Sequence, residues 1–184
     1  MKLYHGTSLD RGKQILQSLK LKGNNVERVY DKNHMFPTTD GYVFLANLEK
    51  AIYYGNITAT LRDYNEFLMV FEVDVEESRL LPDLDEIQYT LKNFGVTDVF
   101  KDIDNPTVME SLTVCKSVMV SGDILLERGK SRYAKIVSSF VTNVENNYQS
   151  YMETKEFVSL IDHDNEYANR FKKEFIDKIH WNIV

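Results

Sequence analysis

Alternating apolar and polar positions predict strands in the first two thirds of the chain. The clearest is 67–75, where every second residue from Phe67 to Val75 is apolar and Glu72 and Asp74 fall on the opposite face. Shorter apolar runs predict further strands at 1–4, 42–45 and 117–120. These segments indicate a core built partly from β-structure.

Helical spacing predicts helices between these strands. Ser8 or Asp10 can cap a first helix, whose apolar stripe begins at Ile15 and which Gly23 is expected to end. Asn47 can cap a second, short helix that Gly55 closes. A third helix is expected over 84–94. The alternation of elements predicts the α+β class.

The pattern changes at Arg132. No glycine or proline occurs between Lys130 and Val184, and apolar residues recur every four positions from Ile136 to Tyr148, which predicts an amphipathic helix. Two more helices are expected over 157–161 and 167–179. We therefore expect a core domain over 1–131 and a helical extension over 132–184, packed on the core or docking a partner.

The composition is that of a soluble globular protein. The chain has 184 residues, of which 43% are hydrophobic and 27% charged, with only 8 Gly and 3 Pro, and this excludes collagen-like, coiled-coil and disordered classes. No apolar run approaches the roughly 18 residues that span a bilayer, so no membrane association is expected. Cys115 is the single cysteine, which favours a cytoplasmic protein without disulfides. One cysteine and four scattered histidines predict no metal site.

Charge is distributed unevenly around a net value of −6. Residues 1–35 carry seven Lys or Arg against three Asp or Glu, whereas residues 36–131 carry eight against seventeen. A basic N-terminal segment on an acidic body suits a ligand that bears phosphate, although a solvated helix face would give the same pattern.

Two short clusters contain the candidate chemistry. In the first, His5 ends a strand, and Gly6 and Thr7 follow, so an imidazole and a hydroxyl flank a backbone that a flat ligand can approach. In the second, a strand from Gly41 to Ala46 precedes a helix that carries aromatic residues just before Gly55. Each cluster alone is also compatible with ordinary turn formation and core packing.

In this order, the two clusters resemble the ADP-ribosyltransferase superfamily, in the branch of diphtheria toxin, the poly(ADP-ribose) polymerases and bacterial toxins that modify nucleic acids. The resemblance covers roughly residues 3–126. It implies an ADP-ribosyltransferase-like fold, which is a split antiparallel β core with peripheral helices. It also implies NAD as co-substrate. In the family, the irregular segment corresponding to 24–40 lies over the NAD site.

The resemblance assigns roles to individual residues. His5 would bind the adenosine ribose, Gly6 would hold the nicotinamide carboxamide through its backbone, and Thr7 would support the ribose. Tyr54 would stack on nicotinamide, with Tyr53 as its substitute. The family's second stacking tyrosine falls on Val43 here, so Tyr42 and Phe44 are the aromatic candidates for that wall.

The family's catalytic carboxylate has three possible counterparts. Strict counting places Cys115 or Lys116 at its position, Glu110 is the nearest upstream carboxylate, and Glu127 lies downstream. Glu110 is the preferred candidate. Glu127 and a chain without a catalytic glutamate remain open.

The resemblance implies a function that the residues alone do not reveal. We expect NAD-dependent transfer of ADP-ribose to a macromolecular acceptor, nucleic acid slightly before protein, by a cytoplasmic toxin or phage-defence effector that an antitoxin protein could neutralise. One alternative is an inactive NAD-binding or protein-interaction module. Another is an NAD-dependent RNA 2′-phosphotransferase, although the sequence lacks the arginine cluster that such enzymes use.

Overall fold

A computed structural model describes residues 1–24, 39–94, 100, 102, 104–140 and 144–184. Within them the chain is a mixed α+β protein whose described strand pairs are all antiparallel, which confirms the predicted class. Seven strands form one sheet in the order β5-β6-β3-β1-β4-β8-β9, and β2 pairs with β7 in a separate ribbon. The strands are β1 (Lys2–Ser8), β2 (Lys20–Leu21), β3 (Tyr42–Ala46), β4 (Phe67–Asp74), β5 (Leu80–Pro82), β6 (Ser117–Ser121), β7 (Ile124–Leu125), β8 (Arg132–Val137) and β9 (Trp181–Ile183).

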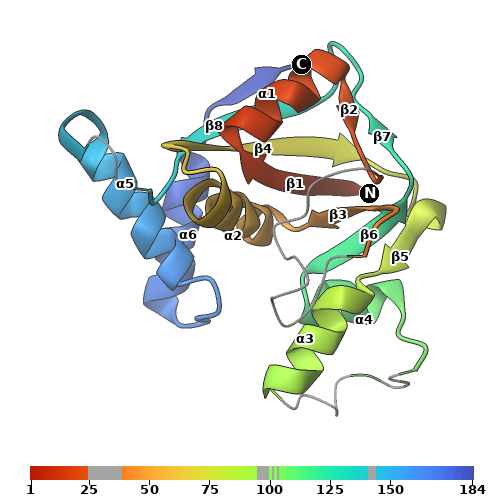
Figure 1. Ribbon diagram of the computed structural model, residues 1–184. Coiled ribbons are helices and arrows are strands. Elements are labelled where there is room, and N and C mark those ends of the chain that lie inside the picture. Colours follow the sequence, from red (N-terminus) through yellow and green to blue (C-terminus); the bar gives the residue numbers. More distant parts are fainter. Residues whose placement is uncertain (25–38, 95–99, 101, 103, 141–143) are drawn as a thin grey trace.

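Helices cover both faces of the sheet, as Figure 1 shows. One face packs on α1 (Leu9–Ser18), and the other packs on α2 (Leu48–Ile57), α5 (Val144–Ser159) and α6 (Glu166–Asp177). The helices α3 (Leu84–Phe94) and α4 (Val108–Val114) lie at the end of the sheet formed by β5 and β6. A π-helical turn, η1 (Thr58–Arg62), continues α2, and a 3-10 turn, η2 (Glu77–Arg79), precedes β5. Within the described residues, no helix is both long and apolar enough to cross a membrane.

The predicted strand at 67–75 is confirmed as β4, and both of its faces are covered. Met69 and Phe71 contribute to the core under α1, whereas Leu68 and Val70 contribute to the core under α2. Glu72 is therefore buried, although alternation alone placed it on the polar face. Its carboxylate is paired instead of solvated.

An ion-pair network accounts for buried Glu72. Its Oε1 lies 3.0 Å from Arg132 Nε and 3.3 Å from Lys2 Nζ, and the hydroxyl of Tyr4 donates to Oε2 at 3.3 Å. Burial raises the pKa of Glu72, but hydrogen bonds from Arg132 and Lys2 outweigh it and lower that pKa. The Arg132 guanidinium also lies 5.2 Å from the centre of the Trp181 ring. The network thus ties β1, β4, β8 and β9 together.

The helix predicted over 136–148 is wrong at its start, and the expected helical extension from residue 132 begins with a strand. Residues 132–137 form β8, which pairs with β4 from Glu72↔Arg132 to Phe67↔Val137. The final strand, β9, then pairs with β8, for example at Ala134↔Trp181. Strand pairing has overridden the four-residue apolar spacing because β8 satisfies the backbone groups along the edge of β4. The main sheet therefore crosses the predicted boundary at residue 131, and only α5 and α6 correspond to the expected helical extension.

The predicted N-caps of α1 and α2 are confirmed, whereas Gly55 does not close α2, which continues to Ile57. The hydroxyl of Ser8 accepts from Arg11 N at 3.4 Å, and the Asn47 side chain accepts from Lys50 N at 2.9 Å. The first helix, however, ends at Ser18 with Leu19 in the left-handed region, φ 53°, and not at Gly23. Gly23 instead packs against Gly122, where a Cβ atom would come 2.9 Å from the carbonyl carbon.

Candidate functional site

The strands β1 and β3 diverge beside His5. The pairing of β1 with β4 extends from Lys2↔Asp74 to Ser8↔Leu68, whereas the described pairing of β1 with β3 is confined to Tyr4↔Ala46. The imidazole of His5 reaches across this divergence, with Nδ1 3.0 Å from the carbonyl oxygen of Phe44. Because a carbonyl oxygen only accepts, Nδ1 is the donor in this contact.

The helix α2 crosses β1 in close contact where Gly55 meets Gly6. A Cβ atom on Gly6 would overlap the carbonyl oxygen of Ala51 and lie 2.9 Å from Gly55 N. A Cβ atom on Gly55 would lie 3.1 Å from Thr7 N. Gly6 is thus required for helix packing, and its Cα side is already filled by α2. Tyr54 precedes Gly55 on α2, so the helix that bears it crosses the His5-Gly6-Thr7 segment.

Tyr53 and Tyr54 form an aromatic pair near the start of α3. Their ring centres are 5.5 Å apart in an edge-to-face arrangement, and Lys50 Nζ lies 5.1 Å from the centre of Tyr53 and 5.4 Å from that of Tyr54. Burial raises the pKa of Tyr53, the nearby Lys50 lowers it, and the carboxylates of Asp162 and Glu86 add to the increase. The pair therefore packs around a cation and has carboxylates close by.

On β3, the aromatic residues Tyr42 and Phe44 face the opposite side of the sheet from Val43. Val43, which matches the family's second stacking residue, is 2% exposed in the core under α1. Ala46 belongs to the core under α2, so strand alternation puts Phe44 and Tyr42 on the α2 face. Phe44 and Tyr42 are both partly exposed. An aromatic wall on the α2 side is thus available despite Val43.

The preferred carboxylate, Glu110, has a local structural role. Its Oε2 accepts from Thr107 N at 2.8 Å and from Thr107 Oγ1 at 2.7 Å, while Glu110 N donates back to Thr107 Oγ1 at 3.2 Å. This capping box begins α4, a helix that packs on β5 and β6. None of these described contacts joins Glu110 to His5 or Tyr54.

Glu127, the other candidate, lies in the exposed turn between β7 and β8. Its carboxylate is 2.6 Å from Lys130 Nζ, and both side chains are exposed to solvent. Its backbone N–H bonds to Ser131 Oγ at 2.9 Å, which fixes the turn. The described contacts of Glu127 are therefore those of a surface residue.

Another carboxylate lies where β5 passes into α3. Asp83 is 3% exposed, its Oδ1 accepts from Glu86 N at 3.0 Å, and its own N–H donates to Ser111 Oγ at 2.9 Å. Burial raises its pKa to about 6. The Ser117 hydroxyl is near enough to oppose that increase, although no hydrogen bond of normal geometry joins it to Asp83. Asp83 is thus a buried helix cap with a perturbed carboxyl group.

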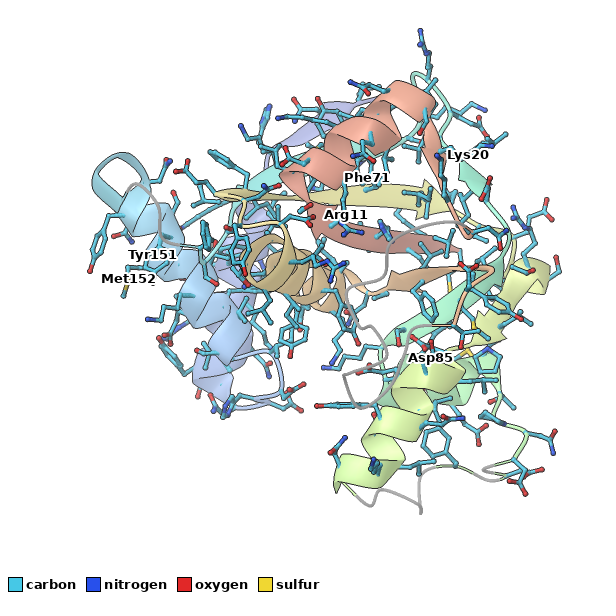
Figure 2. All side chains as sticks on the ribbon, in the orientation of Figure 1. Arg11, Lys20, Phe71, Asp85, Tyr151 and Met152 are labelled. Atoms are coloured by element: carbon cyan, nitrogen blue, oxygen red, sulfur yellow. The ribbon has the colours of Figure 1, made fainter. Side chains whose placement is uncertain are left out.

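Acidic side chains pair with much of the basic N-terminal segment. Arg11 Nε lies 2.8 Å from Asp63 Oδ2, and Figure 2 shows this side chain directed from α1 toward the body of the molecule. Lys20 lies 3.2 Å from Asp123, and Lys13 lies 3.5 Å from Asp10. Arg28 and the rest of 25–38, including the part expected to lie over the NAD site, are outside the described residues. The described cations thus form no unneutralised patch as a group.

The fold brings part of the predicted site together. His5, Phe44, Gly6 and Thr7 lie where Ala51 and Gly55 of α2 cross β1, whereas the described contacts of Glu110 and Glu127 lie elsewhere. Sequence reasoning did not single out Lys50, Asp83 or Glu86. Their contacts depend on the spatial relation of α2 to α3, for which the sequence carries no local signal.

Comparisons with known proteins give no assignment. No family model matches the chain, and neither a curated protein nor a solved structure matches it.

Proposed function

We propose that the protein is an NAD-dependent ADP-ribosyltransferase that modifies a macromolecule. The crossing of Gly6 and Gly55 is the observation that carries this proposal, because it joins the His5-Gly6-Thr7 segment to the helix that bears Tyr54. The divergence of β1 from β3 at His5 supports it, since a sheet that opens there matches the split core that the resemblance implies. An ADP-ribosyltransferase-like arrangement of this antiparallel sheet is part of the proposal.

The residues present fit a flat ring and a ribose. Tyr54 and Phe44 supply aromatic faces, and the His5 imidazole, whose Nδ1 contacts the Phe44 carbonyl, suits a ribose hydroxyl. Because α2 fills the Cα side of Gly6, a carboxamide would meet Gly6 along its backbone edge toward β3. Cleavage of the nicotinamide–ribose bond develops positive charge on the sugar, as glycoside cleavage does, and a nearby carboxylate would stabilise that charge.

The acceptor of ADP-ribose is either a nucleic acid or a protein. The basic excess of residues 1–35 favours a nucleic acid slightly over a protein. Pairing of Arg11 and Lys20 with Asp63 and Asp123 reduces that preference. A toxin or phage-defence effector that acts inside the cell and is neutralised by an antitoxin protein remains the biological setting we propose.

One observation favours an inactive NAD-binding or interaction module as the second candidate. Glu110 caps α4 and Glu127 pairs with Lys130, so neither predicted carboxylate is held toward His5 by its described contacts. Such a module would bind NAD without releasing nicotinamide. An RNA 2′-phosphotransferase is less favoured, because Arg11 is paired with Asp63.

Labelled NAD separates these candidates. We expect the protein to transfer label to one component of a mixture of RNA, DNA and protein, with RNA or DNA ahead of protein. Binding of NAD without transfer of label would support the inactive module instead.

Substituting Tyr54→Ala is expected to weaken NAD binding about tenfold, since aromatic stacking adds roughly 0.5–1.5 kcal/mol beyond buried area. Isothermal titration measures this, and Tyr148→Ala, at an exposed tyrosine of α5, is the control. Unchanged affinity of the Tyr54 variant would contradict the stacking role.

A further inference from the structure

We propose that Glu86 is the carboxylate that acts at the reacting ribose. This inference rests on the proposed function and names a residue for it that the resemblance does not supply. It follows from three features of the fold: the edge at which α2 and α3 begin, the contacts of Lys50, and the local roles of the other carboxylates.

The sheet topology places the beginnings of α2 and α3 at the same edge. Both β3 and β5 are antiparallel to β6, so they run in the same direction. Asn47 begins α2 directly after β3, and Asp83 caps the first turn of α3 directly after β5. Lys50 and Glu86 each lie in the first turn of their helix, with only β6 between the two parent strands. Figure 2 labels Asp85, the residue before Glu86, at this end of α3.

Lys50 connects Glu86 to the aromatic pair. Its Nζ lies 3.4 Å from Glu86 Oε1 and, on the other side, within 5.4 Å of the ring centres of Tyr53 and Tyr54. The side chains of Lys50 and Glu86 are 13% and 18% exposed, so the pair is shielded from bulk water yet not enclosed in the core. A carboxylate in this position can act on charge more strongly than one in open solvent.

The other nearby carboxylates are less suited to the role. Glu110 closes the capping box of α4, and Asp83 is buried beneath its own helix cap at 3% exposure. Asp162, which also raises the pKa of Tyr53, is exposed in the turn after α5. Among these groups, Glu86 alone combines partial burial with a described chain of contacts to Tyr54.

The reaction balances without another reactant. The bond between nicotinamide N1 and ribose C1′ breaks, and its electron pair leaves with nicotinamide, which becomes neutral. Glu86 stabilises the positive charge at C1′ while an oxygen or nitrogen of the acceptor, or of water, forms the new bond to C1′. The acceptor's proton passes to Glu86 and then to solvent.

Four variants test this assignment, with nicotinamide release and NAD affinity measured for each. Glu86→Gln is expected to reduce nicotinamide release at least about 100-fold, the lower range for a positioned acid or base, with NAD affinity changed by less than about threefold. Lys50→Met breaks the same ion pair but keeps the carboxylate, so we expect its release to fall by no more than about tenfold. Glu110→Gln and Asp162→Asn should retain release, the former with a lower urea midpoint.

Nicotinamide release by the wild type and by Glu86→Gln separates failure of the proposed function from failure of the Glu86 assignment. If the wild type releases no nicotinamide, the proposed function fails and the assignment fails with it. If the wild type is active and Glu86→Gln keeps at least a third of its rate, only the assignment of Glu86 is overturned. Loss of release in Glu110→Gln, with folding intact and Glu86→Gln active, would restore Glu110 to the role.

Discussion

Replacing Gly6 with alanine is expected to lower the free energy of unfolding by roughly 3 kcal/mol, the upper end for overpacking in a core. The new Cβ atom would overlap the carbonyl oxygen of Ala51 and lie 2.7 Å from its carbonyl carbon. Both obstacles are backbone atoms of α2, so no side-chain rotation relieves them. The helix must move away from β1, and the proposed NAD site separates with it.

Gly55→Ala is the matched control at the same crossing. Its Cβ atom would meet Thr7 N at 3.1 Å and Leu68 Cδ1 at 3.2 Å, which are tight but tolerable distances. Alanine also gains about 1 kcal/mol of helix propensity over glycine in α2. Urea denaturation should therefore show a much smaller change for Gly55→Ala than for Gly6→Ala. A Gly6→Ala protein within about 1 kcal/mol of wild type would contradict the packing described for β1 and α2.

Asp83→Asn is expected to stabilise the protein at neutral pH and to remove a pH dependence. Burial raises the pKa of Asp83 from 3.8 to about 6, so the folded state holds a proton that the unfolded chain loses. Stability from this group is consequently full below about pH 4 and falls as the pH rises to about 6. The shift corresponds to about 3 kcal/mol, and asparagine keeps the oxygen that accepts from Glu86 N.

Urea denaturation at a series of pH values tests this prediction. The Asp83→Asn variant should exceed the wild type by about 2–3 kcal/mol at pH 7.5 and match it near pH 4. Asp85→Asn, at a half-buried position of the same helix where the carboxylate accepts from Thr39, should show no comparable gain. An Asp83→Asn variant that is less stable than the wild type at pH 7.5 would show that the folded protein requires the charged carboxylate.

Local signals explain the parts of the fold that the sequence predicts. Asn47 caps α2, and the alternation of Phe67 to Val75 marks β4, because both depend on neighbouring residues. A local signal for the role of Glu110 is present as well: Thr107 precedes it by three residues, which is the spacing of a capping box. This spacing favours a helix-capping role for Glu110 over a catalytic one.

Other features depend on contacts between distant segments. Ile136 begins the predicted helical stripe but lies in β8, because Arg132–Val137 pairs with β4, some 60 residues earlier, as at Glu72↔Arg132. Glu86 lies 36 residues beyond Lys50, and their ion pair requires β3 and β5 to run in the same direction on either side of β6. No pattern within a single element encodes either relation.

Nicotinamide release from NAD by the wild type and by His5→Ala is the most direct test of the proposed activity. The structure places the His5 imidazole at the divergence of β1 and β3, with Nδ1 3.0 Å from the Phe44 carbonyl oxygen. We predict that the wild type releases nicotinamide and that His5→Ala, folded as judged by its urea midpoint, loses most of this activity. A wild type that releases no nicotinamide, with RNA, DNA and protein acceptors all present, would contradict the proposed activity.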